Sequence, residues 1–175
     1  MMDKFNNTIE QKKSEPIPII YLDGAIKTIQ QQPERVRVVV MRGPQGSGKD
    51  FTAFALAEQV GWGFDRIIST DEYYFLNAQE LNYIESVLKK IATHEEVLDQ
   101  REHYDRLSEQ DKNELYQYRL ECLPKIRGRA GDLSQYHWTP EKRDWAQMYM
   151  RVLGRMYLEQ GKALLLMLCT PRLLH

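Results

Sequence analysis

The sequence predicts an α/β fold built on a parallel sheet, and three observations carry this prediction. Residues 35–41 (RVRVVVM) are almost continuously apolar and β-branched after Arg37, which is typical of a parallel strand buried on both faces. A glycine-rich loop and a segment with helical spacing follow this strand directly. Two further short apolar runs, at 65–70 and 163–169, are separated by long helical stretches. Three strands are visible, and we expect the sheet they form to be incomplete.

The N-terminal region is predicted to contribute one short helix. Residues 1–16 are rich in Asn, Gln, Lys and Glu with almost no apolar anchor, so they are expected to form a disordered tail. Residues 17–22 (IPIIYL) are apolar but contain Pro18, which favours an extended docking segment. Asp23 is expected to cap the helix, and Pro33 would stop it. The domain is therefore expected to span 17–175.

The helix after the glycine loop is predicted over 50–60, because its apolar residues have helical spacing and Gly61 can end it. Residues 65–70 (DRIIST) predict a short second strand. This strand closes on an acidic and aromatic cluster at 71–75 (DEYYF).

A charged helical insertion is expected at about 78–134. Its first part, 78–123, has apolar residues at the i, i+3, i+4 spacing of an amphipathic helix. Residues 124–131 are predicted to form a loop, and the basic run KIRGR at 125–129 is the best candidate for a local basic patch. A solvated loop without a ligand is the alternative for that run. The insertion is also the candidate surface for a protein partner.

The last part of the chain predicts a helix and a third strand. Thr139 and Pro140 form a helix start, with the hydroxyl as cap and proline in the first turn. The helix is expected to run to Gln160, where Gly161 ends it. The apolar run 163–169 (ALLLMLC) then predicts a buried strand.

Composition excludes several classes of protein. The net charge is −1, so no global field attracts the chain to nucleic acid or an anionic membrane. The longest apolar run is too short to span a bilayer, and no membrane contact is expected. Two distant cysteines favour a reducing compartment, and the polar start is unlike a presequence. These features predict a cytoplasmic or nuclear protein.

Residues 43–50 (GPQGSGKD) fit the phosphate-binding pattern G-x-x-x-x-G-K and lack only the final Ser or Thr. Glycines let the backbone wrap a phosphate, and the following helix adds its positive N-terminal end. Lys49 would reach the outer phosphates of a nucleotide. The residues expected to bind nucleotide are Gly43, Pro44, Gln45, Gly46, Ser47, Gly48, Lys49, Asp50 and Phe51.

Asp50 stands where this pattern normally offers a neutral hydroxyl to Mg²⁺. A carboxylate can also bind the metal, but it brings negative charge close to a polyphosphate. At about 5 Å and an effective dielectric constant near 20, one charge pair repels by roughly 3 kcal/mol before Mg²⁺ offsets it. ATP binding is expected, with weakened affinity.

The segments GPQGSGKDFTAFALAE and IISTDEYYF resemble the NEDD-four-binding-protein-two-like proteins, which are grouped with polynucleotide kinases among the small P-loop kinases. Ser69 to Tyr73 matches the second block of that family, S-T-D-D-[FY]-F. The resemblance implies a P-loop NTPase-type parallel sheet, ATP and Mg²⁺ as cofactors, and Asp71 as general base on an acceptor hydroxyl. Lys49 and Asp71 are then the catalytic candidates, and Asp50 and Asp71 the candidates for metal binding.

The resemblance continues at Tyr136 to Pro140 and at Ala146-Gln147, where Gln replaces a histidine of the family. The family then has a strand ending in D-N-T-N, of which only Thr170 remains. An arginine-bearing lid and the later strands of complete members are also missing from the sequence.

Two functional interpretations follow, together with a third possibility about the chain itself. One is a kinase that transfers the γ-phosphoryl of ATP to a hydroxyl of a nucleic acid or small molecule. The other is a catalytically inactive P-loop scaffold or protein-interaction module. A truncated, poorly folding isoform is the third possibility. The sequence does not specify the acceptor.

Overall fold

A computed structural model describes residues 22–44 and 46–169. The predictions for the tail 1–16, for most of the segment 17–22, for Gln45 and for Thr170 fall outside these residues.

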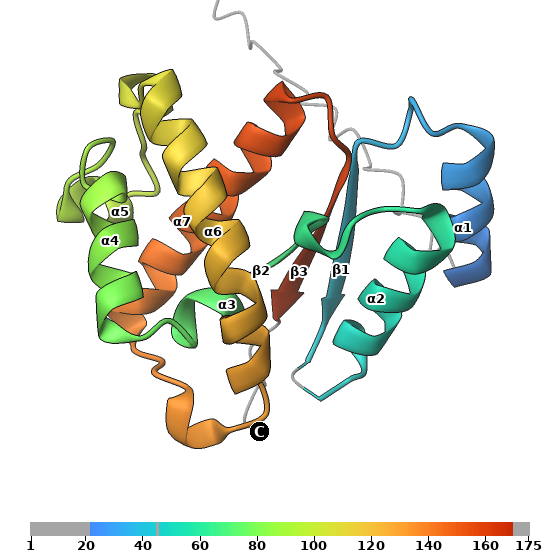
Figure 1. Cartoon of the computed structure of the whole chain (residues 1–175), viewed down its shortest axis with the longest axis horizontal. Coiled ribbons are helices and arrows are strands. Elements are labelled where there is room, and N and C mark those ends of the chain that lie inside the picture. Colours follow the sequence, from blue (N-terminus) through green and yellow to red (C-terminus); the bar gives the residue numbers. More distant parts are fainter. Residues whose placement is uncertain (1–21, 45, 170–175) are drawn as a thin grey trace, which may run out of the picture.

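Three parallel strands form an open sheet in the order β1-β3-β2 (Figure 1). They are β1 (Val38–Gly43), β2 (Ile67–Ser69) and β3 (Leu164–Cys169). The last strand in the chain lies in the centre, with Val38 of β1 opposite Leu164 and Ile67 of β2 opposite Leu165. All three predicted strands are confirmed, and the chain has an α/β fold.

Two helices cover one face of the sheet, α1 (Leu22–Gln31) and α2 (Lys49–Val60). Buried Leu56 and Ala57 of α2 pack there with Ile67 and Leu165 from the strands. The predicted end of α2 is confirmed, because Gly61 adopts a left-handed conformation at φ 74° and its amide donates to carbonyls of the last turn. These contacts hold α2 on the sheet. Its first turn, which follows the glycine loop, therefore lies next to the carboxyl end of β1.

A larger helical layer covers the opposite face (Figure 1). It consists of α3 (Asp71–Tyr74), α4 (Ala78–Leu88), α5 (His94–Leu98), α6 (Glu109–Arg129) and α7 (Pro140–Glu159). Short 3₁₀ turns lie at Phe64–Arg66, Tyr104–Arg106 and Leu133–Gln135. No helix within 22–44 and 46–169 is both long and apolar enough to cross a membrane.

The predicted helical stretch 78–123 is broken into separate helices by two capping boxes. Thr93 accepts from the amide of Glu96 and starts α5, and Ser108 accepts from the amide of Asp111 and starts α6. The predicted start of α7 is confirmed, since Thr139 accepts a hydrogen bond from the amide of Lys142 at 3.1 Å.

The prediction of a loop at 124–131 is wrong, because α6 continues through Pro124 to Arg129. Proline removes one hydrogen bond of a helix, but Leu123 and Ile126 on either side are buried and hold this turn in place. The basic run inside it is not a free patch either. The Arg129 guanidinium pairs with the Glu80 carboxylate at 2.6 Å.

The expectation that β1 is buried on both faces is also wrong. Its residues alternate between exposed and half-buried, and Val38 and Val40 are 39% and 46% exposed. Among the described strands β1 lies at the edge of the sheet, and α7 packs mainly against β2 and β3. Within the described part of the chain, one face of β1 is therefore left open.

Candidate phosphate-binding loop and adjoining pocket

The chain between β1 and α2 turns at glycines that adopt a conformation other residues avoid. Gly46 and Gly48 have φ angles of 78° and 81°. A Cβ atom on Gly43 would come within 2.8 Å of the Ser47 hydroxyl oxygen. This loop, residues 43–48, therefore depends on glycine at positions 46 and 48, and a Cβ at position 43 would require the Ser47 side chain to shift.

The loop leads directly into α2, and no side chain caps the start of that helix. Gly48 is the N-cap residue and carries no side chain that could accept from the first turn. The amides of Lys49, Asp50 and Phe51 lie in that first turn, at the positive end of the helix dipole. An uncapped helix start of this kind is suited to an anion.

Lys49 lies folded back over the loop. Its ammonium nitrogen donates to the carbonyl oxygen of Pro44 at 2.7 Å. Phe51, by contrast, is 83% exposed, so only its backbone can serve an anion at the helix start. Gln45 is outside the described part of the chain.

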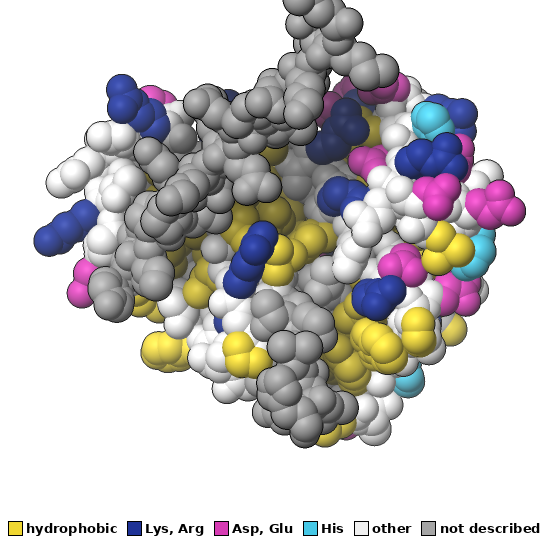
Figure 2. Space-filling view, turned by 180° about the vertical axis from the view of Figure 1, so that it is seen from behind, with side chains coloured by type: hydrophobic (Ala, Val, Ile, Leu, Met, Phe, Trp, Pro, Cys, Tyr) yellow, Lys and Arg dark blue, Asp and Glu magenta, His cyan; other side chains and the backbone are white. Residues whose placement is uncertain are grey.

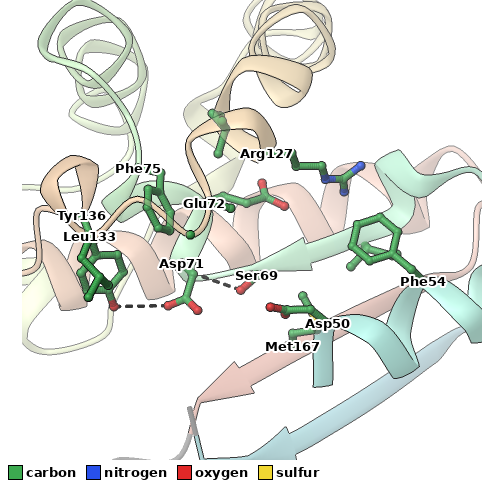
Figure 3. A pocket seen from close by; sticks show the side chains of 14 residues that line it. Asp50, Phe54, Ser69, Asp71, Glu72, Phe75, Arg127, Leu133, Tyr136 and Met167 are labelled. Atoms are coloured by element: carbon green, nitrogen blue, oxygen red, sulfur yellow. Dashed lines mark hydrogen bonds between the residues drawn. The ribbon is translucent and has the colours of Figure 1, made fainter. Parts of the chain in front are cut away.

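A pocket of about 440 Å³ adjoins the start of α2. It lies between α2, the carboxyl ends of β2 and β3, and the end of α6 with the loop that follows (Figure 3). Its lining comprises Asp50, Phe54, Ile67, Ser69, Asp71, Glu72, Phe75, Ile126, Arg127, Ala130, Gly131, Leu133, Tyr136 and Met167. Ligands of open α/β sheets bind at this end of the strands.

The pocket brings together the two predicted metal ligands, Asp50 from α2 and Asp71 from α3 (Figure 3). The Asp71 amide donates to the Ser69 hydroxyl oxygen at 3.2 Å, and the Tyr136 hydroxyl donates to the Asp71 carboxylate at 3.4 Å. Lys49 does not line the pocket, although it immediately precedes Asp50.

Glu72 is chemically distinct from its neighbour Asp71. Its two carboxylate oxygens accept from the Arg119 guanidinium at 3.1 and 2.9 Å, and both side chains are buried. Asp71 is only half-buried and turns toward the pocket (Figure 3). Of the two adjacent acids, Glu72 is held in an ion pair and Asp71 is presented to the pocket.

Arg127 and Phe54 line the pocket, although neither was predicted as a residue of the nucleotide site. The Arg127 guanidinium donates to the Phe64 carbonyl at 2.6 Å and lies 5.0 Å from the centre of the Phe54 ring. Burial lowers the pKa of Arg127. No sequence signal distinguishes Phe54, and Arg127 was singled out only as part of the basic run 125–129, not as part of this pocket.

Among the described residues, no group of three or more His, Cys, Asp and Glu side chains is arranged to hold a metal ion. Mg²⁺ bound with substrate phosphates commonly uses only one or two carboxylates and keeps several waters. Asp50 and Asp71, which line one pocket, fit that smaller requirement.

Comparison of the chain with protein-family models, with curated proteins and with solved structures gave no match.

Proposed function

We propose that this chain is a P-loop kinase-like protein that binds a nucleoside triphosphate, with ATP the first candidate. The phosphates lie on the loop 43–48 and the start of α2, where Gly46 and Gly48 adopt left-handed conformations and the N-cap residue has no side chain to accept from the amides of the first turn. One observation carries the proposal: Asp50, in the first turn of that helix, lines the same pocket as Asp71. The loop and the pocket are therefore two parts of one continuous site.

In this site Lys49 contacts the outer phosphates. Its ammonium group bonds a loop carbonyl, that of Pro44, and a phosphate is the stronger partner because the hydrogen bond is then between two charges. Asp50 and Asp71 would hold Mg²⁺ or its waters, and the metal would supply positive charge that offsets the charge of the phosphates. Since Asp50 replaces a neutral hydroxyl, nucleotide affinity is lower than the loop alone would give.

The reaction is transfer of the γ-phosphoryl group to a hydroxyl of an acceptor in the pocket. The acceptor oxygen bonds to the γ-phosphorus while the bond from that phosphorus to the β,γ-bridging oxygen breaks. Asp71 accepts the proton of the acceptor hydroxyl. Its carboxylate suits that role because Ser69 and Tyr136 fix its backbone and side chain in the pocket.

Binding without transfer is the second candidate function, and the charge of Asp50 beside the phosphate loop favours it. In that case the chain is a nucleotide-binding scaffold. A protein partner on the helices between 78 and 134 stays a prediction from the sequence.

Thermal unfolding with and without Mg-ATP tests the binding step. Ligand at about 100 times its dissociation constant stabilises a protein by about 2.7 kcal/mol, or a few degrees in melting temperature at this size. Gly48→Ala should abolish that shift. Gly161→Ala is the matched control, since the two glycines have φ angles of 81° and 71° and open space around an added Cβ. Absence of a shift in the native protein, on a cooperative melt, would refute nucleotide binding.

Asp71→Asn tests the transfer step. This variant should keep part of the shift with Mg-ATP, because Asp50 remains as a ligand for the metal, while transfer of labelled phosphate to a panel of 5′-hydroxyl oligonucleotides and nucleosides should fall by at least about 100-fold. If the native protein labels no acceptor but keeps the thermal shift, only the binding candidate remains. Equal labelling by the native protein and the Asp71→Asn variant would remove Asp71 from the mechanism.

A further inference from the structure

The pocket beside the phosphate loop has mainly apolar walls. Phe75 and Tyr136, whose ring centres are 5.1 Å apart, lie on one side of it with Asp71, and Phe54 lies across from them (Figure 3). The aliphatic residues that complete these walls are Ile67, Ile126, Ala130, Leu133 and Met167. Pockets for small molecules typically have roughly 300–1,000 Å³ and apolar walls with a few polar groups that orient the ligand. At about 440 Å³ this pocket suits a small ligand with an apolar body.

The charged side chains of the pocket are mostly acidic. Of the described residues that line it, Asp50, Asp71 and Glu72 are acids, and Arg127 is the one base. The Arg127 guanidinium is already engaged by a backbone carbonyl at 2.6 Å and by the aromatic ring over which it lies. A phosphate group on the acceptor would therefore bring negative charge next to carboxylates, without a guanidinium that is free to pair with it.

The surface formed by the described residues offers no continuous basic track to a polyanion. In the basic run beside the pocket, Arg127 is engaged as described, and Arg129 pairs with Glu80. On the side of the molecule opposite to the view of Figure 1, the described Lys and Arg side chains are scattered among Asp and Glu side chains (Figure 2). Proteins that bind a nucleic-acid backbone cluster their basic side chains along its phosphates. These features disfavour a polynucleotide as the acceptor.

We propose that the acceptor is a small uncharged alcohol that carries a flat ring, with a nucleoside as the first candidate. This inference rests on the proposed function and names the substrate class of the same site. The ring packs against the aromatic walls, since edge-to-face and offset-stacked ring pairs are favourable. The hydroxyl lies at Asp71, which takes its proton as the hydroxyl oxygen bonds to the γ-phosphorus and ADP leaves.

Titration of the full chain with thymidine and with thymidine 3′-monophosphate, without nucleotide, tests this inference and requires no turnover. The two probes share the ring and the 5′-hydroxyl and differ by one phosphate. In NMR spectra of protein labelled at Ile and Met methyl groups, thymidine should shift the signals of Ile67, Ile126 and Met167, which line the pocket. It should bind at least about tenfold more tightly than its 3′-monophosphate, because like charges brought together oppose binding. Equal or tighter binding of the monophosphate would overturn the inference.

Leu133→Lys should weaken this preference. Leu133 lines the pocket and is 75% exposed, so a lysine there adds a positive charge to the pocket and leaves the core intact. The ratio of the two affinities should fall by at least about fivefold. Leu98→Lys is the matched control, because Leu98 is also an exposed leucine, at 54%, and does not line the pocket. The same ratio in both variants would contradict the charge argument.

The outcomes separate this inference from the proposed function. If Mg-ATP stabilises the chain but thymidine leaves the methyl signals unchanged, the inference fails and nucleotide binding stands. If thymidine binds in the pocket but Mg-ATP gives no thermal shift, the proposed function fails, and the pocket keeps its assignment as a site for uncharged alcohols with a ring. Labelling of oligonucleotides in preference to nucleosides in the transfer assay would also overturn the inference.

Discussion

The buried guanidinium of Arg119 gives the sharpest prediction for stability. Its side chain is 1% exposed and extends from α6. It bonds to α3, to the segment 65–67 and to α7. It forms the two-point ion pair with Glu72 and donates to the carbonyls of Asp65 and Ile67 at 2.6 and 2.9 Å. It also donates to the Tyr157 hydroxyl at 3.1 Å. Arg119→Met keeps much of the side-chain volume and removes all of these donors.

Removing one partner of a buried ion pair costs about 3–5 kcal/mol, because the other charge stays buried and unpaired. In Arg119→Met the unpaired charge is the Glu72 carboxylate, and the carbonyls of Asp65, in the turn before β2, and of Ile67, at the start of β2, also lose their donor. For a domain of this size each kcal/mol corresponds to about 2–4 °C, so the melting temperature should fall by about 6–20 °C. The double variant Arg119→Met/Glu72→Leu should recover part of that loss.

Thermal and urea unfolding of both variants measure this prediction, and Arg101→Met is the control. Arg101 pairs with Asp99, but both side chains are more than 60% exposed, so its loss should change stability by less than about 1 kcal/mol. The reasoning fails if Arg119→Met and Arg101→Met melt at the same temperature. It also fails if the double variant is less stable than the single one.

Two further predictions concern local interactions. The hydrogen bond from Arg129 lowers the pKa of Glu80, so this pair stabilises the fold above the ordinary glutamate pKa and loses that contribution as pH falls through the folded value. In urea unfolding, the stability deficit of Glu80→Gln should be largest near pH 7 and shrink below about pH 4, and a constant deficit would contradict the assignment. Thr139→Ala should cost about 1 kcal/mol, since it removes the cap of α7. Thr28→Ala, whose hydroxyl bonds the Gly24 carbonyl within α1, should be nearly neutral, and equal losses for both would refute the cap's role.

Local backbone chemistry made several elements predictable from the sequence. Gly61 ends α2 and Thr139 begins α7, because a left-handed glycine and a hydroxyl cap act within a few residues of their own position. The turn of the glycine loop follows from Gly46 and Gly48 for the same reason. Asp50 and Asp71 could be placed at one pocket because both follow strands whose carboxyl ends meet at one edge of the sheet.

Features decided by distant parts of the chain could not be predicted. Burial of β1 was expected from its apolar run, but the order of the described strands leaves it at the edge, where helices cover only one face. Pro124 was expected to lie in a loop, yet the packing of Ile126 and the pairing of Arg129 keep it inside a helix. In both cases tertiary contacts outweigh the local preference.

The basic character of α6 has a structural cause that the sequence conceals. Arg127 donates to the Phe64 carbonyl and Arg129 to the Phe75 carbonyl, at either end of the segment that carries β2 and α3. Arg119 donates to the Ile67 carbonyl between them. Backbone carbonyls leave no side-chain signature. The arginines of a run that the sequence offers only as a candidate basic patch or a solvated loop instead help to fix the segment that presents Asp71. Neutralising these arginines should therefore lower the free energy of unfolding and displace Asp71. Any change in the affinity for anions should be a consequence of that displacement.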